Sequence, residues 1–283
     1  MVVQHNLSAM NTSRQMNSVS SAMSKSTEKL SSGYKINRAG DDAAGLSISE
    51  KMRSQIRGLN KAASNAQDGI SLVQVAEGAL NETHSILQRM NELATQAAND
   101  TNTSVDRGAI KAEIDQLTSE IDRIQSTTQF NSMNLLDGTF SSKKLQLQVG
   151  ALSGQSIGVS IAKMSASALS LKAAGKAGKD GEILLKVSSF SAAGAAMKTI
   201  QDAIKKVSDT RSKLGAIQNR LEHTINNLNT TSENTQAAES RIRDTDMASE
   251  MVEYSKNNIL AQAGQSMLAQ ANQQTQGVLS LLG

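Results

Sequence analysis

The 283-residue sequence contains no cysteine, no proline and no tryptophan, and its tyrosines and phenylalanines number five together. The missing cysteine excludes a disulfide framework, a thiolate nucleophile and any zinc site that needs sulfur ligands. Average usage of proline, about 5%, would give roughly 14 in a chain of this length. With so few rings, aromatic side chains cannot anchor the packing, so the composition departs from that of an ordinary globule.

Long apolar runs are also missing. No stretch approaches the roughly 20 residues of a membrane-spanning helix, and the first residues lack the basic start and apolar core of a cleaved signal peptide. The sequence therefore predicts a protein that is not inserted in a membrane. Such a protein either stays in the cytoplasm or leaves by a route that does not read such a peptide.

Charge is scarce at both ends of the chain. The net charge is +3, yet residues 1–24 carry one permanent charge, Arg14, and residues 257–283 carry none. A solvated surface normally carries charged side chains. The two uncharged ends are therefore expected to be covered, by each other and by neighbouring molecules.

Hydrophobic spacing predicts helices over residues 3–32, 46–99 and about 110–124, and a return to helix from about residue 192 onward. The longest of them carries a seven-residue repeat that is typical of a coiled coil: Met52, Leu59, Ala66, Val73, Leu80, Leu87 and Ala94. Its 54 residues would extend about 80 Å, which exceeds the roughly 50 Å diameter of a compact sphere of this size. The predicted fold is mainly α, an elongated antiparallel bundle of the N- and C-terminal halves.

The middle of the chain interrupts the helices. Residues 128–140 are predicted to form a loop in which Phe130 and Phe140 fill the packing beneath it. Alternating apolar residues predict a small β-hairpin over 145–149 and 157–161, followed by an exposed tip at 173–181 and one more strand over 182–190.

The sequence contains none of the common catalytic motifs considered next. The sequence has no HExxH, no GxxxxGK[ST] and no GxSxG. Asp41 or Asp42 is better explained as a helix cap than as a metal ligand. The remaining candidates have structural or solvent-exposed interpretations as well: His84 as a packed polar residue, His5 and His223 as lone residues, and Lys172, Lys176 and Lys179 as a solvated tip. No enzyme activity, cofactor, metal or nucleic-acid partner is predicted.

The last helix predicts self-association. It places Leu260, Gly264 and Met267 on one stripe and is otherwise rich in Gln, Asn, Ser and Ala. We expect one stripe to be covered by the first helix of the same chain and the uncharged remainder by other copies. Head-to-tail contacts that do not close generate filaments.

Five segments resemble one family, the bacterial flagellins. They are SSGYKINRAGDDAAGLSIS (31–49), LQRMNELATQAAN (87–99), TQFN (128–131), ESRIRDTDMASEM (239–251) and ILAQAGQSMLAQANQQTQGVLSLL (259–282). The similarity covers roughly residues 1–140 and 190–283. The middle is short, so the chain is similar to a flagellin with a minimal variable region.

This resemblance implies a structural subunit that self-assembles head-to-tail into the extracellular flagellar filament used for swimming. Residues 1–42 and 244–283 would form an inner tube, and residues 43–243 an outer one that includes the reduced variable segment at 141–189. The implied partners are copies of the chain, the type III export apparatus, an export chaperone, and hook-associated and cap proteins. The implied polymerisation residues are Leu7, Met10, Leu260, Met267, Leu268, Val278, Leu279, Leu281 and Leu282.

The resemblance also implies recognition by the vertebrate Toll-like receptor for flagellin. The matching positions are Gln88, Arg89, Leu93, Gln96 and Glu113. The apolar C-terminal residues resemble the segment read by cytosolic inflammasome sensors.

Two other functions remain as alternatives. A hook–filament junction protein would share the terminal helices but would not elongate into long filaments. A flagellin with a metalloprotease insert would be an enzyme, and the short middle segment without HExxH argues against it.

Overall fold

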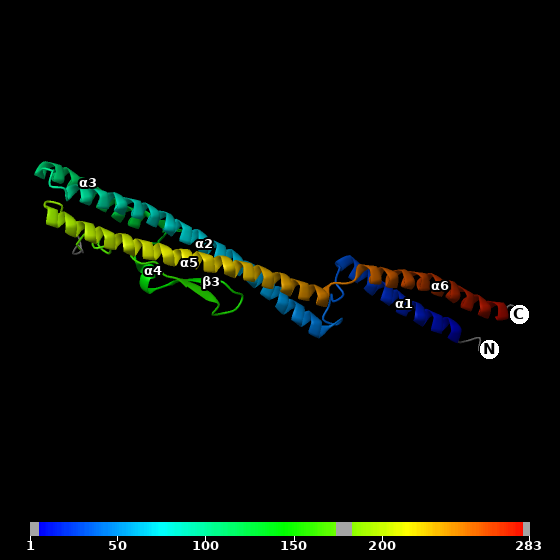
Figure 1. Ribbon diagram of the computed structural model, residues 1–283. Coiled ribbons are helices and arrows are strands. Elements are labelled where there is room, and N and C mark those ends of the chain that lie inside the picture. The colour runs from blue at the N-terminus through cyan, green and yellow to red at the C-terminus, as the bar shows by residue number, and fades with distance from the viewer. Residues whose placement is uncertain (1–5, 174–182, 280–283) are drawn as a thin grey trace. The chain divides into compact units, whose positions relative to one another are not determined.

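The computed structural model describes residues 6–173 and 183–279, with side chains over 6–173 and 183–274. Helices dominate these residues, and the named strands form two separate antiparallel pairs (Figure 1). The mainly α fold with a small β region in the middle is thereby confirmed. The elements are α1 (Leu7–Ser32), α2 (Ala43–Ala97), α3 (Ser104–Thr127), β1 (Gln129–Phe130), β2 (Met133–Asn134), α4 (Thr139–Ser142), β3 (Leu145–Gln148), β4 (Ser156–Val159), α5 (Phe190–Arg243) and α6 (Met247–Leu279).

The chain divides into two compact units. The terminal unit comprises Met1–Ile56 and Glu233–Gly283, and the central unit comprises Arg57–Ser232. Helices α2 and α5 each continue from one unit into the other. No helix in the described part of the chain is long and apolar enough to cross a membrane.

In the terminal unit, α1 and α6 pair in antiparallel directions (Figure 1). Toward the chain termini, the Asn6 side chain donates to the carbonyl of Ala271 at 3.0 Å. The ammonium of Lys29 lies 3.4 Å from Glu250 at the other end. The predicted pairing of the first and last helices within one chain is confirmed.

Helix α1 begins and ends at capping residues. Asn6 accepts a hydrogen bond from the amide of Ala9, so the described helix starts at Leu7, and the predicted start at Val3 lies outside the described residues. Gly33 ends it in the left-handed conformation with φ 75°, as the sequence predicts. Its amide donates to the carbonyl of Lys29.

The acidic pair before α2 has two structural roles. Asp42 accepts from the amide of Gly45 at 2.9 Å and caps the helix. Asp41 accepts from the amides of Arg38 and Asn37, and these bonds lower the pKa of Asp41. Across residues 6–173 and 183–279, no group of three metal-ligating side chains occurs. The cap interpretation is confirmed at Asp42.

The central unit contains the hydrophobic core. The heptad positions of α2 from Leu59 to Ala94 are buried, as the repeat predicts. Leu59 clusters with Leu228 and Ala66 with Leu221, so the residue numbers run in opposite directions and α2 and α5 are antiparallel. Helix α3 adds its own stripe of isoleucines to the core: Ile110, Ile114 and Ile121.

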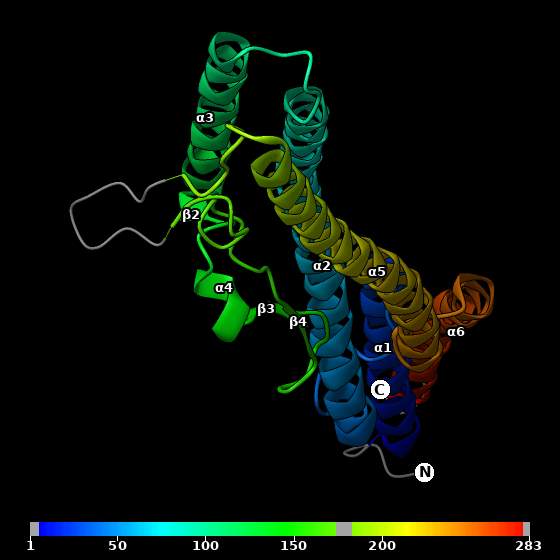
Figure 2. The ribbon, with the colours of Figure 1, turned by 60° about the vertical axis from the view of Figure 1, so that its left-hand side comes forward.

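The β3–β4 hairpin lies against α2 (Figure 2). Its strands pair antiparallel with Leu147 opposite Ile157, which confirms the predicted hairpin. Two helical glycines make room for it, because a Cβ on Gly69 would collide with Leu147 and one on Gly58 would lie 2.8 Å from the Cβ of Ala151. These glycines do not interrupt α2.

Two predictions for the middle segment need correction. The strand predicted over 182–190 is wrong in the described residues: Ile183 forms a single bridge with Lys172, and Leu185 and Val187 pack into the core instead of pairing. The segment 128–140, predicted as a loop, also contains the short β1–β2 pair and the first residues of α4. Helix α5 begins at Phe190, in agreement with the predicted return of helix near residue 192.

The predicted lysine tip also changes. Lys172 is not part of a solvated tip, because its ammonium lies 3.5 Å from Asp122 and its side chain is only 17% exposed. Asp122 also accepts from the amide of Ala166, so the carboxylate holds this segment of chain against α3. Lys176 and Lys179 lie outside the described residues.

Candidate self-association surface of the terminal helices

The terminal unit exposes large apolar side chains. Of the fourteen exposed large hydrophobic residues in the described part of the chain, nine belong to this unit. They are Leu7, Met10, Ile48, Met247, Met251, Val252, Ile259, Leu260 and Met267. Val252 is 69% exposed and Ile259 66% exposed, values unusual for residues in the middle of a helix that has a packed partner.

The same unit has almost no core of its own. Among its described residues, the buried hydrophobic ones are Ile36 and Ala271. Where α1 meets α6, the buried side chains include Ser26 and Asn257, which contribute little apolar area. The hairpin therefore leaves its hydrophobic surface uncovered instead of folding around it.

The predicted polymerisation residues lie mainly on this surface. Leu7, Met10, Leu260 and Met267 are exposed, between 46% and 67%. Leu268 is half-buried and faces α1, where it lines a shallow groove with Met10. Val278 and Leu279 continue the helical backbone of α6. Leu281 and Leu282 lie outside the described residues.

The free energy gained by covering this surface is of the same order as the cost of association. Complete burial of one such side chain from full exposure contributes about 1.5–3 kcal/mol, so burying the exposed part of all nine, which are 46–69% exposed, contributes about 8–15 kcal/mol. Loss of translational and rotational freedom on association costs about 4–15 kcal/mol. Because α6 carries no charge after Lys256, covering that part of the helix does not require desolvating an ion.

A second candidate surface lies on α2 and α3 in the central unit. Arg89 reaches across from α2 to Glu113 of α3 at 3.1 Å and also contacts Glu92 at 3.2 Å. The hydrogen bonds that Arg89 donates, chiefly to Glu113 and then to Glu92, raise the pKa of its guanidinium. Gln88 is exposed beside His84, with a 3.0 Å contact between their side-chain nitrogens.

The other two predicted receptor positions differ in burial. The side chain of Gln96 is exposed, and its backbone carbonyl accepts from Asn102 in the α2–α3 turn. Leu93 is 2% exposed and packs in the core. Its side chain supports the surface from beneath and is not part of the accessible face.

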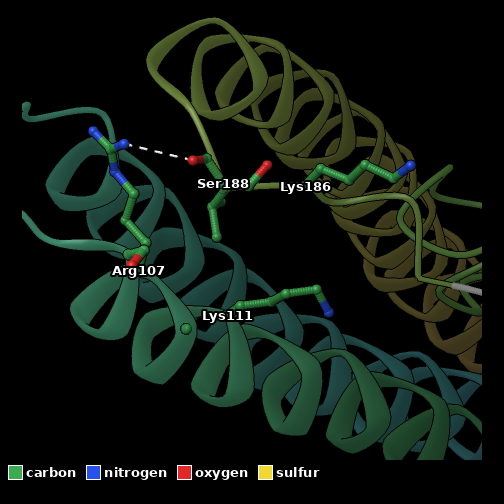
Figure 3. Close-up of a pocket in the computed structure, with 7 residues that line it drawn as sticks. Arg107, Lys111, Lys186 and Ser188 are labelled. Carbon is green, nitrogen blue, oxygen red and sulfur yellow. Dashed lines mark hydrogen bonds between the residues drawn. The ribbon is translucent and has the colours of Figure 1, made fainter.

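A pocket of about 300 Å³ lies at the start of α3, beside residues 186–188 (Figure 3). Arg107 there donates to the carbonyls of Ala97 and Ser188, and its guanidinium also pairs with Asp100. Lys111 pairs with Asp115 at 2.6 Å. In Figure 3 the Lys111 and Lys186 side chains extend away from the Arg107 guanidinium. These cations do not converge on one point, so the pocket does not form an anion site.

The histidines do not form a site in the described chain. His84 is half-buried on α2, as expected for a packed polar residue, and its Nδ1 makes no hydrogen bond there. His223 is exposed on α5. His5 lies outside the described residues.

A large exposed apolar surface on a helical hairpin indicates a protein–protein interaction site, as expected for a subunit that associates with its copies. The comparisons with known proteins agree with that class. Residues 3–141 match the bacterial flagellin N-terminal helical region, and residues 197–282 match the bacterial flagellin C-terminal helical region. The chain belongs to the bacterial flagellin family.

Relatives match along their whole length. The chain is 55% identical to a flagellin of Halalkalibacterium halodurans and 54% identical to one of Bacillus subtilis, with all of both chains covered in each case. It is 50% identical, again over all of both chains, to the flagellar filament 33 kDa core protein of Treponema phagedenis. The protein is accordingly a structural subunit of the flagellar filament and not an enzyme.

Two solved structures match parts of the chain. The Bacillus cereus flagellin crystal structure is 32% identical, with a TM-score of 0.48, covering 62% of this chain and 94% of that one. A putative flagellar hook-associated protein from Vibrio parahaemolyticus is 15% identical, with a TM-score of 0.59, covering 72% of this chain and all of that one. The second likeness concerns the fold alone.

Proposed function

We propose that residues 1–42 and 244–283 pack with their copies into the inner tube of the filament. Residues 43–243 then form the outer layer, with the 141–189 segment on its surface. The observation that carries this proposal is the exposure of eight large apolar side chains on the α1–α6 hairpin, whose described residues bury almost none. The uncharged end of α6, residues 257–283, fits the same segment of neighbouring copies, because that segment brings no charge to bury.

Seeded polymerisation tests the proposal. Purified monomer is mixed with short filament fragments, and its elongation is followed by light scattering and electron microscopy. We expect long filaments from the full chain and none from a chain that lacks residues 257–283. A hook–filament junction protein would bind the seeds without elongating, and normal elongation by the truncated chain would overturn the assignment of the inner tube.

The exposed apolar residues of α6 also fit a flagellar export chaperone that covers them before export through the type III apparatus. Val252, Ile259 and Leu260 would then be protected in the complex and exposed in the free monomer. Hydrogen exchange of the monomer with and without chaperone measures this. Protection confined to the central unit would contradict it.

A second function is supported by the surface on α2 and α3. We propose that Gln88, Arg89, Gln96 and Glu113 form the face that the vertebrate Toll-like receptor for flagellin contacts, held in place by Leu93 beneath. The 3.1 Å pair of Arg89 with Glu113 fixes the two helices relative to each other at this face. The proposal is tested by measuring receptor signalling in response to the Arg89→Ala variant.

The chain offers a matched control for that test. Arg123 pairs with Glu120 on the same helix, at 2.6 Å, and lies on α3 outside the predicted face. We expect Arg89→Ala to lower signalling at least tenfold and Arg123→Ala to leave it unchanged. If the two substitutions changed signalling equally, the assignment of this face as the receptor contact would be wrong. The C-terminal segment predicted for cytosolic sensors is tested separately, by delivering the 257–283 truncation to the cytosol.

A further inference from the structure

The C-terminal end of α2 is not capped by its own sequence. Helices commonly end with a glycine, or with a basic residue that donates to the last carbonyls. Neither the last turn of α2 nor the three residues that follow it, 98–100, contain one. Because the last four carbonyls of a helix have no partner within it, this end of α2 needs donors from elsewhere in the chain.

Arg107, near the start of α3, supplies such donors. Its Nε donates to the carbonyl of Ala97 at 3.0 Å, and its Nη2 donates to the carbonyl of Asn99 at 3.3 Å. Nη2 also lies 3.1 Å from the Asp100 carboxylate. Nη1 donates to the carbonyl of Ser188 at 3.5 Å, just ahead of α5 (Figure 3). One side chain thus joins the end of α2 and the start of α3 to the segment that leads into α5.

This arrangement requires the fork of a guanidinium. Arginine has five N–H donors fixed in one plane, whereas lysine has three on a single nitrogen atom. Separated donors are needed to reach the carbonyls of Ala97, Asn99 and Ser188 at once. Ala97 is fully buried, so the loss of its donor would leave a buried carbonyl without that hydrogen bond.

The face proposed for the receptor lies next to this junction. Gln96 directly precedes Ala97 at the end of α2. Glu113 lies about 9 Å beyond Arg107 along α3. Arg89 lies about 12 Å before Ala97 along α2. The 3.1 Å contact between Arg89 and Glu113 therefore joins the two helices within about two or three turns of the Arg107 junction.

We propose that Arg107 is a positioning residue for this face: it ties the start of α3 to the end of α2 and so holds Glu113 beside Arg89 in the arrangement that the receptor contacts. The inference rests on the receptor contact proposed above. Rigid helices carry a displacement at one end along their length, and a preformed surface binds with a smaller ordering cost. Arg107 acts through the two helices and does not itself touch the receptor.

Arg107→Lys tests the proposal, because it keeps the charge and loses the fork. Arg211→Lys is the matched control. Arg211 also joins two helices, reaching from α5 to Glu77 of α2 at 3.7 Å, and its side chain is 30% exposed. It lies outside the proposed face, since Glu77 lies about 17 Å before Gln88 along α2.

Two measurements are made on each monomer, at a temperature where circular dichroism shows that it is folded. The first is its affinity for the isolated ectodomain of the receptor, and the second is amide hydrogen exchange over residues 96–103. We expect Arg107→Lys to weaken binding about threefold or more and to speed exchange in that segment. Arg211→Lys should leave both at the values of the parent chain.

A double-mutant cycle separates positioning from a general loss of stability. Arg89→Ala removes one member of the pair that Arg107 aligns, so Arg107→Lys should weaken binding less in that background than in the parent chain. Additive effects would overturn the proposal, as would unchanged affinity in Arg107→Lys or equal losses in Arg107→Lys and Arg211→Lys.

The proposed receptor contact fails separately, if Arg89→Ala alone leaves the affinity unchanged. Hydrogen exchange then decides the role of Arg107, because it needs only the monomer. Faster exchange over residues 96–103 in Arg107→Lys would support its hold on the end of α2, and unchanged exchange would overturn it.

Discussion

The side chain of Leu147 in β3 lies directly over Gly69 of α2, in the space that a Cβ would occupy. This contact seats the hairpin on the helix, and it is made possible by the absence of a side chain at Gly69. A glycine in a helix interior costs about 1 kcal/mol relative to alanine, so the close approach of the hairpin explains why one is placed there.

Gly58 is the second glycine beneath the hairpin, and a Cβ there would lie 2.8 Å from the Cβ and 3.3 Å from the backbone Cα of Ala151, which cannot rotate away as the end of Leu147 can. Gly58→Ala should therefore destabilise the central unit by about 1–3 kcal/mol through overpacking, although alanine is the better helix former. Gly78 on the same helix is the control, because a Cβ there meets nothing within 4 Å. Gly78→Ala should be neutral or stabilising by up to about 1 kcal/mol. Urea unfolding of both variants measures the difference. Equal effects would mean that the hairpin does not lie on α2 as described.

Leu93→Ala should lower the free energy of unfolding by about 2–5 kcal/mol, because it leaves a cavity between packed helices. Leu7→Ala, at a position that is 67% exposed, should change it by less than about 0.5 kcal/mol. Chemical denaturation followed by circular dichroism measures both. A small effect at Leu93 would contradict its placement in the core and return it to the accessible receptor face.

Acid should weaken the cap of α3. The hydrogen bond from the Thr103 hydroxyl, followed by that from the Thr103 amide, lowers the pKa of Asp106 below its ordinary value of 3.8. A carboxyl with a depressed folded pKa stabilises the fold above its unfolded pKa and loses that contribution as pH falls through the folded value.

Thermal unfolding should be measured from pH 8 to pH 2. Asp106 should contribute nothing to the pH dependence of stability between pH 5 and 8, and its stabilising contribution should be lost below about pH 4. Asp106→Asn should be less stable than the parent at pH 7 and should lose less on acidification. An identical acid profile for the two chains would show that this carboxylate does not support the cap.

A single charge on α6 should block assembly without unfolding the subunit. Ile259→Glu places a carboxylate on the exposed apolar surface, and burying an unpaired charge costs several kcal/mol. Ser153→Glu is the control, at an exposed polar position in the turn between β3 and β4 of the central unit. Seeded elongation should stop in the first variant and persist in the second, with unchanged circular dichroism in both. Elongation by Ile259→Glu would show that copies do not cover this residue.

The helices could be predicted from the sequence because they follow a single rule. The seven-residue repeat from Leu59 to Ala94 is a pattern of local spacing, and the residues at its positions are buried in the structure as that spacing predicts. The caps at Asp42 and Gly33 are likewise encoded within a few residues. The self-association surface was indicated by the missing charge after Lys256.

Long-range contacts set the limits of prediction. The pattern over 182–190 alternates like a strand, yet Leu185 and Val187 are buried against helices, which no local signal distinguishes from pairing in a sheet. The burial of Leu93 and the contacts of the Tyr34 ring likewise depend on segments distant in sequence. The contact between Arg243 and Tyr34 joins residues about 200 positions apart and has no spacing motif.

The burial of the terminal hairpin by its copies can be measured with one probe, because the chain has no cysteine of its own. Ile259→Cys provides a unique thiol on α6, and Ser153→Cys provides one in the exposed turn between β3 and β4. Both are labelled with a thiol reagent in monomer and in filament. We predict fast labelling at both positions in the monomer, and in the filament fast labelling at 153 with strong protection at 259. Equally fast labelling at 259 in the filament would contradict the account.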